Sequence, residues 1–299
     1  MFRVLFLAVL AGIAYSLSGV AYRFGAKDHL NSRQVLLPVT VLSCLVFFRQ
    51  GCQEHASWQF LALAAGAGAA QYFMVFFFQL ALRRGPLTPM WCALMLCFVP
   101  VILYAGIFLK EPITPFQVGS IVLAAAAVIA AAYSNRKMPE ASEPKVDAAV
   151  PERKGRKISL VYVVILLMLP ALNGFSNIAL KTASAMPEYE GAEHLYMTVF
   201  FGMPALLIFL EFLFTCGWPR LSRHLAISTL LGAGGNSLGM WLLSLAVTAP
   251  AALVFTALNT ASILSAGILS VTFFGEKRSS AWYWMIVLSV GAIVLSNLK

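Results

Sequence analysis

The chain has 299 residues, of which 60% are hydrophobic and only 11% are charged. Soluble domains are about 45–50% apolar and about 25% charged, so this chain lacks the polar residues to cover a water-soluble globule of its size. An apolar helix of about 20 residues crosses the hydrocarbon core of a bilayer. The composition therefore predicts an all-α membrane protein that crosses the lipid bilayer many times.

The formal net charge of +9 does not indicate a nucleic-acid partner. Such binding needs a basic face on a folded module, whereas Lys and Arg here lie in short runs between apolar segments. The five cysteines form no CxxC pair, so we predict no disulfide framework, no metal site and no cofactor.

Ten transmembrane helices are predicted from the apolar runs and from their polar or Pro/Gly breaks. In chain order they cover residues 3–22, 32–48, 58–82, 88–109, 114–133, 158–180, 194–214, 225–247, 251–274 and 281–298. The one long hydrophilic stretch, 134–157, carries three prolines among mixed charges. It is interpreted as a linker between two five-helix halves, 1–133 and 158–299.

The two halves come into register when the sequence is shifted by 165 residues, which predicts an internal repeat. Leu80-Ala81 then falls on Leu245-Ala246, and Glu111 falls on Glu276. Because each half has an odd number of helices, the second half must enter the membrane in the opposite sense. Inverted repeats of this kind are common in secondary transporters.

The distribution of Lys and Arg predicts the orientation. These residues are more frequent in the linker and in the other loops on its side than on the opposite side, which includes both tails. The positive-inside rule therefore predicts a plasma (inner) membrane protein with a cytoplasmic linker and external termini.

A family resemblance rests on the end of each half. A helix with Pro100, then Leu109-Lys110-Glu111-Pro112 and a helix of small residues, resembles the end of an EamA domain of the drug/metabolite transporter superfamily. Phe274-Gly275-Glu276-Lys277 and the closing helix resemble the same ending in a second copy, and Lys110 departs from the Gly of that pattern. The resemblance implies two inverted five-helix repeats that move small metabolites or export amino-acid-like compounds. Relatives include sugar-phosphate exchangers and proteins that flip lipid-linked carriers.

Acidic residues do not suggest a proton relay, because no carboxylate lies in the middle of a predicted span. Glu211 lies in the last turn of its span and is interpreted as an interfacial acid. Glu111 and Glu276 close their helices at turns and are expected to be structural. Uniport, exchange or potential-driven movement is therefore favoured.

Polar side chains near the middle of the spans are the predicted substrate site, because an amide in hydrocarbon needs a partner or a wet cavity. Asn173 and Asn177 are four residues apart and share one helix face. Gln71 falls on Asn236 in the 165-residue register. Interhelical hydrogen bonding is the alternative role for each of these residues. The predicted substrate-binding residues are Tyr15, Ser16, Gln71, Tyr72, Asn173, Asn177, Asn236, Trp241 and Asn259.

The sequence thus predicts a secondary transporter, either an exporter or an exchanger, of a small neutral or zwitterionic metabolite such as an amino acid or a drug-like compound. An enzyme is not expected, because no span pairs a nucleophile with a base. The alternatives are a flippase for a lipid-linked carrier and a channel, although no rings of polar residues indicate a pore. A monomer and a homodimer are both compatible with the sequence.

Overall fold

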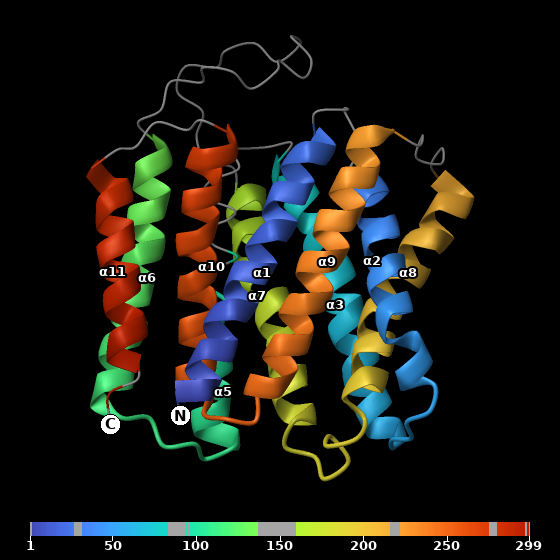
Figure 1. Ribbon diagram of the computed structural model, residues 1–299, viewed down its shortest axis with the longest axis horizontal. Helices are drawn as coiled ribbons and strands as arrows, with labels where there is room; N and C mark the ends of the chain where they lie inside the picture. The colour runs from blue at the N-terminus through green and yellow to red at the C-terminus, as the bar shows by residue number, and fades with distance from the viewer. Residues whose placement is uncertain are drawn as a thin grey trace.

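The computed structural model describes residues 2–26, 32–82, 94, 96–136, 160–215, 222–274, 280–296 and 298. These residues form an all-α bundle of ten helices (Figure 1). The helices of the first part of the chain are α1 (Phe2–Ala26), α2 (Ser32–Gly51), α3 (Trp58–Leu82), α5 (Phe98–Phe108) and α6 (Pro115–Arg136). Those of the second part are α7 (Leu160–Ala183), α8 (Glu193–Thr215), α9 (Arg223–Ala246), α10 (Ala251–Phe274) and α11 (Ser280–Ser296).

The helix bounds follow the predicted spans closely, and α3 and α10 coincide with theirs. Most of the first half of the predicted span 88–109 lies outside the described residues, and α5 covers its second half. The predicted linker begins inside α6, which continues to Arg136, and residues 137–157 of it lie outside the described part of the chain.

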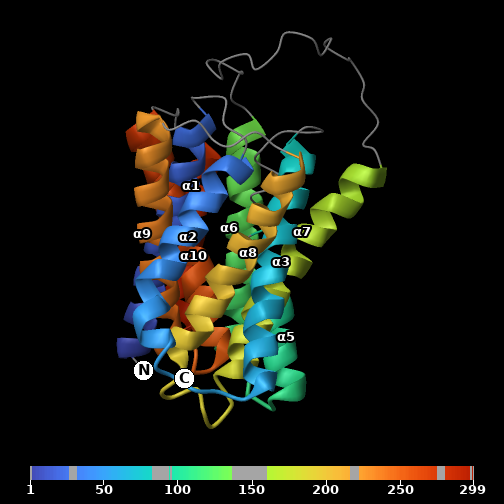
Figure 2. The ribbon, with the colours of Figure 1, turned by 90° about the vertical axis from the view of Figure 1, so that its right-hand side faces the viewer.

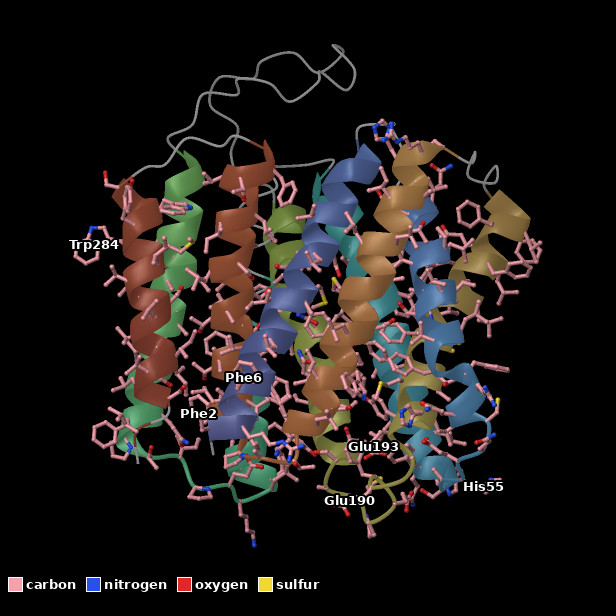
Figure 3. All side chains as sticks on the ribbon, viewed as in Figure 1. Phe2, Phe6, His55, Glu190, Glu193 and Trp284 are labelled. Carbon is pink, nitrogen blue, oxygen red and sulfur yellow. The ribbon has the colours of Figure 1, made fainter. Side chains whose placement is uncertain are left out.

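Within the described residues, five helices contain an apolar stretch long enough to cross a bilayer, which indicates a multi-pass membrane protein. These stretches are Phe2–Ala21, Arg33–Gly51, Trp58–Phe77, Glu193–Phe214 and Ala251–Phe273. Large apolar side chains also cover the outside of the bundle. Trp284, for example, projects outward from α11 and is 63% exposed (Figure 3).

Local capping explains where α6 and α9 begin. The Thr114 and Gln117 side chains each accept a hydrogen bond from the other's backbone N–H, at 3.3 and 3.0 Å, which is a capping box. Pro115 is the first residue of α6, where a missing N–H costs nothing. The Ser222 hydroxyl accepts a hydrogen bond from Leu225 N at 3.0 Å and caps α9.

The helix α10 is the most enclosed element of the bundle, because residues 251–263 are all buried. It packs against α1, α5, α6 and α11. α1 also packs against α9, α2 packs against α8, α3 packs against α7 and α8, and α6 packs against α11 (Figures 1 and 2). Segments from the two parts of the chain therefore alternate through the bundle.

The two ends of the bundle differ in which parts of the chain lie there. Both chain termini lie at one end, hereafter the termini end (Figure 1). α6 ends and α7 begins at the opposite end, hereafter the α6–α7 end (Figure 1). The predicted placement of the termini opposite the connection between the halves therefore agrees with the path of the chain.

Candidate functional site

A cluster of amides surrounds one thiol where α5, α7 and α10 meet. The Cys97 thiol, just before α5, donates to Asn259 Oδ1 at 3.5 Å. Asn177 Nδ2 donates to Cys97 Sγ at 3.8 Å, and the Asn173 side chain, one helical turn before Asn177, lies near the same thiol. The structure thus brings together three of the predicted site residues, and we call Cys97, Asn173, Asn177 and Asn259 the central amide cluster.

The central amide cluster lies deep in the bundle. Cys97 is 1% exposed and Asn259 is 5% exposed. Asn259 is eight residues from the start of α10 and Cys97 is eleven residues from the end of α5, so they lie about 12 and 16 Å from the termini end. This depth is close to the midplane of a hydrocarbon core about 30 Å thick.

Two threonine hydroxyls extend the polar surface of α10 next to the cluster. Thr256 and Thr260 lie three residues before and one residue after Asn259, and both are fully buried. Neither hydroxyl has a hydrogen-bond partner among the described residues. A buried hydroxyl without a partner costs free energy, so a solute or a water bound here would gain hydrogen bonds that the protein leaves unmade.

A buried lysine lies one turn beyond the central amide cluster. Lys181 is 3% exposed, and its Nζ lies 2.6 Å from Glu111 Oε1. The same Nζ donates to the carbonyl oxygens of Val247 and Ala249 at 2.9 and 2.7 Å. Lys181 therefore satisfies carbonyl groups at the end of α9, where a cation also complements the helix dipole.

Glu111 completes this contact from the first part of the chain. It follows α5, and its Oε2 accepts a hydrogen bond from Ala251 N at 2.7 Å, in the first turn of α10. Lys110, just before it, has a φ of 54°, a left-handed conformation that turns the chain. The expectation that Glu111 is structural agrees with these contacts.

The same end is also tied by the segment between α7 and α8. The Tyr189 hydroxyl donates to the Ser244 carbonyl oxygen at 3.2 Å, in the last turn of α9. Burial raises the pKa of Tyr189 well above its usual value, and the nearby Glu193 carboxylate raises it further. The phenol therefore stays protonated and continues to donate at physiological pH.

A second charged contact lies toward the α6–α7 end. The Arg33 guanidinium on α2 pairs with the Glu211 carboxylate on α8, and the two side chains are 21% and 19% exposed. The Tyr72 hydroxyl on α3 donates to Glu211 Oε2 at 2.9 Å. Arg33 also lies 5.0 Å from the centre of the Phe76 ring, which adds a cation–π interaction.

This contact changes the interpretation of Glu211. The sequence analysis interpreted Glu211 as an interfacial acid. In the structure its carboxylate on α8 binds Arg33 of α2 and Tyr72 of α3. Charged residues within spans are rare and usually mark functional positions. Tyr72, a predicted site residue, thus belongs to this charged contact.

The predicted residues on α1 and α9 make hydrogen bonds between or within these helices. The Ser18 hydroxyl donates to Asn236 Oδ1 at 2.6 Å, and the Tyr15 hydroxyl donates to Met240 Sδ at 3.4 Å. The Ser16 hydroxyl donates to the Ile13 carbonyl oxygen at 2.6 Å within α1. These contacts favour the interhelical alternative over a substrate site for Asn236.

Two further predicted residues lie apart from these contacts. Gln71 on α3 is half-buried, and none of the described residues hydrogen bonds to its side chain. Trp241 is 43% exposed and lies on an exposed stripe of α9 together with Leu238 and Leu245. A stripe of exposed apolar residues at helical spacing is typical of a lipid-facing surface, so Trp241 is placed with the bilayer.

A carboxylate–histidine group at the termini end is the one group in the described part of the chain with metal-ligating geometry. Glu54, Glu193 and His194 offer ligand atoms that all lie within 4.8 Å of one another. Each acid already accepts a hydrogen bond: Glu54 Oε2 from Leu195 N at 2.7 Å and Glu193 Oε2 from Gly191 N at 3.1 Å. Figure 3 shows Glu193 beside the turn at this end. Acids at the start of α8 are explained by its helix dipole, so we assign no metal here.

Comparison with known proteins supports the fold and leaves the family open. No protein-family model matches the chain, and no curated protein matches it. A crystal structure described only as that of a protein matches with a TM-score of 0.73 and 14% sequence identity. The match covers 98% of this chain and 95% of that chain. At this identity the likeness is one of fold alone, and it extends over the whole bundle.

Cys97, Lys181 and Arg33 belong to these contacts but were not among the predicted site residues. Cys97 has the pattern of an apolar helix residue, and Lys181 and Arg33 lie near the ends of spans, where basic residues usually report topology. A signal for Lys181 was present, because Asn173, Asn177 and Lys181 recur at intervals of four and therefore share one face of α7.

Proposed function

We propose that the chain is a secondary transporter that moves a small neutral or zwitterionic metabolite, such as an amino acid or a drug-like compound, by alternating access. The central amide cluster is the observation that carries this proposal. It offers amide and thiol groups near the midplane, with the Thr256 and Thr260 hydroxyls next to it, and the described side chains in it carry no fixed charge. Such groups suit the polar parts of an uncharged or zwitterionic solute, since each amide can both donate and accept.

The proposed architecture is two inverted five-helix repeats, as in the drug/metabolite transporter superfamily that the sequence resembles. Trp58 and Pro115, shifted by 165 residues, fall on Arg223 and Ser280, where α9 and α11 begin. α1 starts at the termini end, whereas α7 starts at the α6–α7 end, so the two halves run in opposite senses (Figure 1). Both observations support an inverted repeat.

The contacts between helices also correspond when each helix of one half is replaced by its counterpart in the other half. α1 packs against α9 as α7 packs against α3, and α3 packs against α8 as α9 packs against α2. The pairs α2–α8, α5–α10 and α6–α11 each map onto themselves. This pattern is what a two-fold relation between the halves would produce, and it supports a site shared by both.

Flux through proteoliposomes tests this function. The purified chain is reconstituted and assayed for uptake and counterflow with a panel of labelled amino acids and other neutral metabolites. We expect saturable flux of at least one solute class, reduced in Asn177→Ala and Asn259→Ala and retained in Trp241→Leu. The Trp241→Leu variant is the matched control, because this side chain lies on the outer stripe of α9.

Other outcomes would support other functions. Flux that does not saturate and shows no counterflow would support a channel. Movement of a fluorescent lipid between leaflets, without solute flux, would support a flippase. A folded protein that moves none of these probes would contradict the proposal.

A further inference from the structure

Ion pairs join the two parts of the chain at both ends of the bundle. Arg33–Glu211 joins α2 to α8, and Lys181–Glu111 joins the end of α7 to the segment after α5. In each pair, one residue lies before position 137 and the other lies after position 159. A hydrogen-bond contact between His194 Nδ1 and Glu54 Oε1, which are 2.7 Å apart, also joins the two parts near the start of α8.

These pairs lie on opposite sides of the central amide cluster. Arg33 is the second residue of α2, which begins at the α6–α7 end, and Glu211 is four residues from the end of α8. Lys181 is in the last turn of α7, at the termini end. The cluster lies between the two levels, and Asn177 is one helical turn from Lys181.

We infer that Arg33–Glu211 and Lys181–Glu111 are the closing contacts of the two ends, and that each breaks when its own end opens. The inference rests on the proposed function, because alternating access requires two halves to separate at one end while they stay joined at the other. Tyr72 is a positioning residue in this account, since it holds the Glu211 carboxylate toward Arg33.

The two closing contacts differ in strength. Lys181 is almost fully buried and has three acceptors, and Glu111 also holds the first turn of α10. The two acids are equally exposed, Glu211 at 19% and Glu111 at 20%, but the Arg33 side chain is 21% exposed whereas that of Lys181 is 4% exposed. Water can therefore replace the contacts of Arg33 at a lower cost. The α6–α7 end should therefore open more readily than the termini end.

One face of α7 carries residues of both the central amide cluster and the Lys181–Glu111 contact. Asn173, Asn177 and Lys181 share one face of this helix, so a rigid movement of α7 displaces all three together. α5 should move together with α7, because Gly174 of α7 packs directly against Pro100 of α5. A solute that binds Asn177 would thereby act on Lys181 without touching it.

Cys97 is a native reporter for this inference. It is 1% exposed in the closed bundle and lies between the two contacts. A protein in which the other four cysteines are replaced by alanine is assayed in right-side-out and inside-out membrane vesicles with a membrane-impermeant maleimide. Leu298→Cys, in a second protein in which all five native cysteines are replaced by alanine, identifies the vesicles in which the termini end faces the reagent.

We expect Glu211→Gln and Arg33→Gln to speed labelling of Cys97 from the α6–α7 end. We expect Glu111→Gln to speed it from the termini end. The increase should be about tenfold for Glu211→Gln and Arg33→Gln, which corresponds to a loss of about 1.4 kcal/mol in the closing contact. It should be larger for Glu111→Gln, which removes the acid of the stronger contact. The exchange Arg33→Glu with Glu211→Arg should restore slow labelling, because it restores the pair.

Glu188→Gln is the matched control, because its carboxylate accepts hydrogen bonds from Ser57 at the exposed surface of the termini end. It should leave labelling unchanged. Labelling that stays slow in all three variants, or that rises equally from both ends in each, would overturn the inference. No solute is needed for this assay, so it can fail while flux is observed, and flux can fail while labelling behaves as expected.

Discussion

Lys181 and Glu111 meet 2.6 Å apart, although 70 residues separate them in the chain. Between them they hold the last carbonyl groups after α9 and the first N–H of α10, so one ion pair fixes the turn that joins two helices. This relationship gives the termini end of the bundle a buried polar contact instead of an apolar one. It also makes a strong prediction about stability.

Lys181→Met should destabilise the protein strongly. It leaves Glu111 without its cation and two carbonyl groups without their donor, and breaking a buried pair on one side costs about 3–5 kcal/mol. The apparent melting temperature of the purified protein in detergent measures this loss. Adding Glu111→Gln should recover part of it, and a double variant no more stable than Lys181→Met would contradict the pairing.

Adjacent glycines on α9 should respond in opposite ways to alanine. A Cβ at Gly235 would lie 2.7 Å from the Ala14 carbonyl oxygen, whereas a Cβ at Gly234 would have nothing within 4 Å. Gly235→Ala should therefore force α1 and α9 apart and lower the melting temperature. Gly234→Ala should stabilise the helix by about 0.5–1 kcal/mol. Equal effects at the two positions would argue against the close packing of α1 on α9.

Asn236→Leu should weaken the fold and not the transport of solute. Its amide accepts a hydrogen bond from Ser18, and hydrogen bonds between membrane helices contribute about 0.6 kcal/mol on average. The melting temperature should fall slightly while the flux per folded molecule stays the same. Ser18→Ala should behave alike. A loss of flux at unchanged stability would return Asn236 to the substrate site.

Gln71→Leu distinguishes the two amides that the 165-residue register pairs. Gln71 has no hydrogen-bond partner among the described residues, so removing it should cost little stability. If it contributes to solute binding, the half-saturating concentration for flux should rise about 2- to 13-fold, as expected for one hydrogen bond of about 0.5–1.5 kcal/mol. Unchanged flux would remove Gln71 from the site.

The helices of this fold could be predicted from sequence because each is a long apolar run with a clear break. α10, for example, follows Pro250 and has no charged residue over its whole length. A span in a bilayer must satisfy its own backbone, so an apolar run of that length has few alternatives to a helix. Asn173 and Asn177 were recognised for the same reason, since amides in such a run stand out.

The partners of these residues could not be predicted, because they come from distant segments. Asn259 meets a thiol 162 positions away, and Glu211 meets an arginine 178 positions away. Helical periodicity shows which residues share a face and does not show which face of another helix lies opposite. Asn236 and Trp241 illustrate this limit, because both lie within α9. Asn236 accepts a hydrogen bond from Ser18 of α1, whereas Trp241 lies on the exposed stripe of α9.

The most direct test of the central claim is whether a transported solute protects Cys97. The single-cysteine protein with Glu211→Gln is labelled with maleimide at increasing concentrations of a solute that shows saturable flux. A solute bound at the central amide cluster should slow labelling of Cys97, with a half-effect at the concentration that half-saturates flux in the same variant. Labelling that does not change at concentrations that saturate flux would show that the solute binds elsewhere, and would contradict the assignment of this cluster as the transport site.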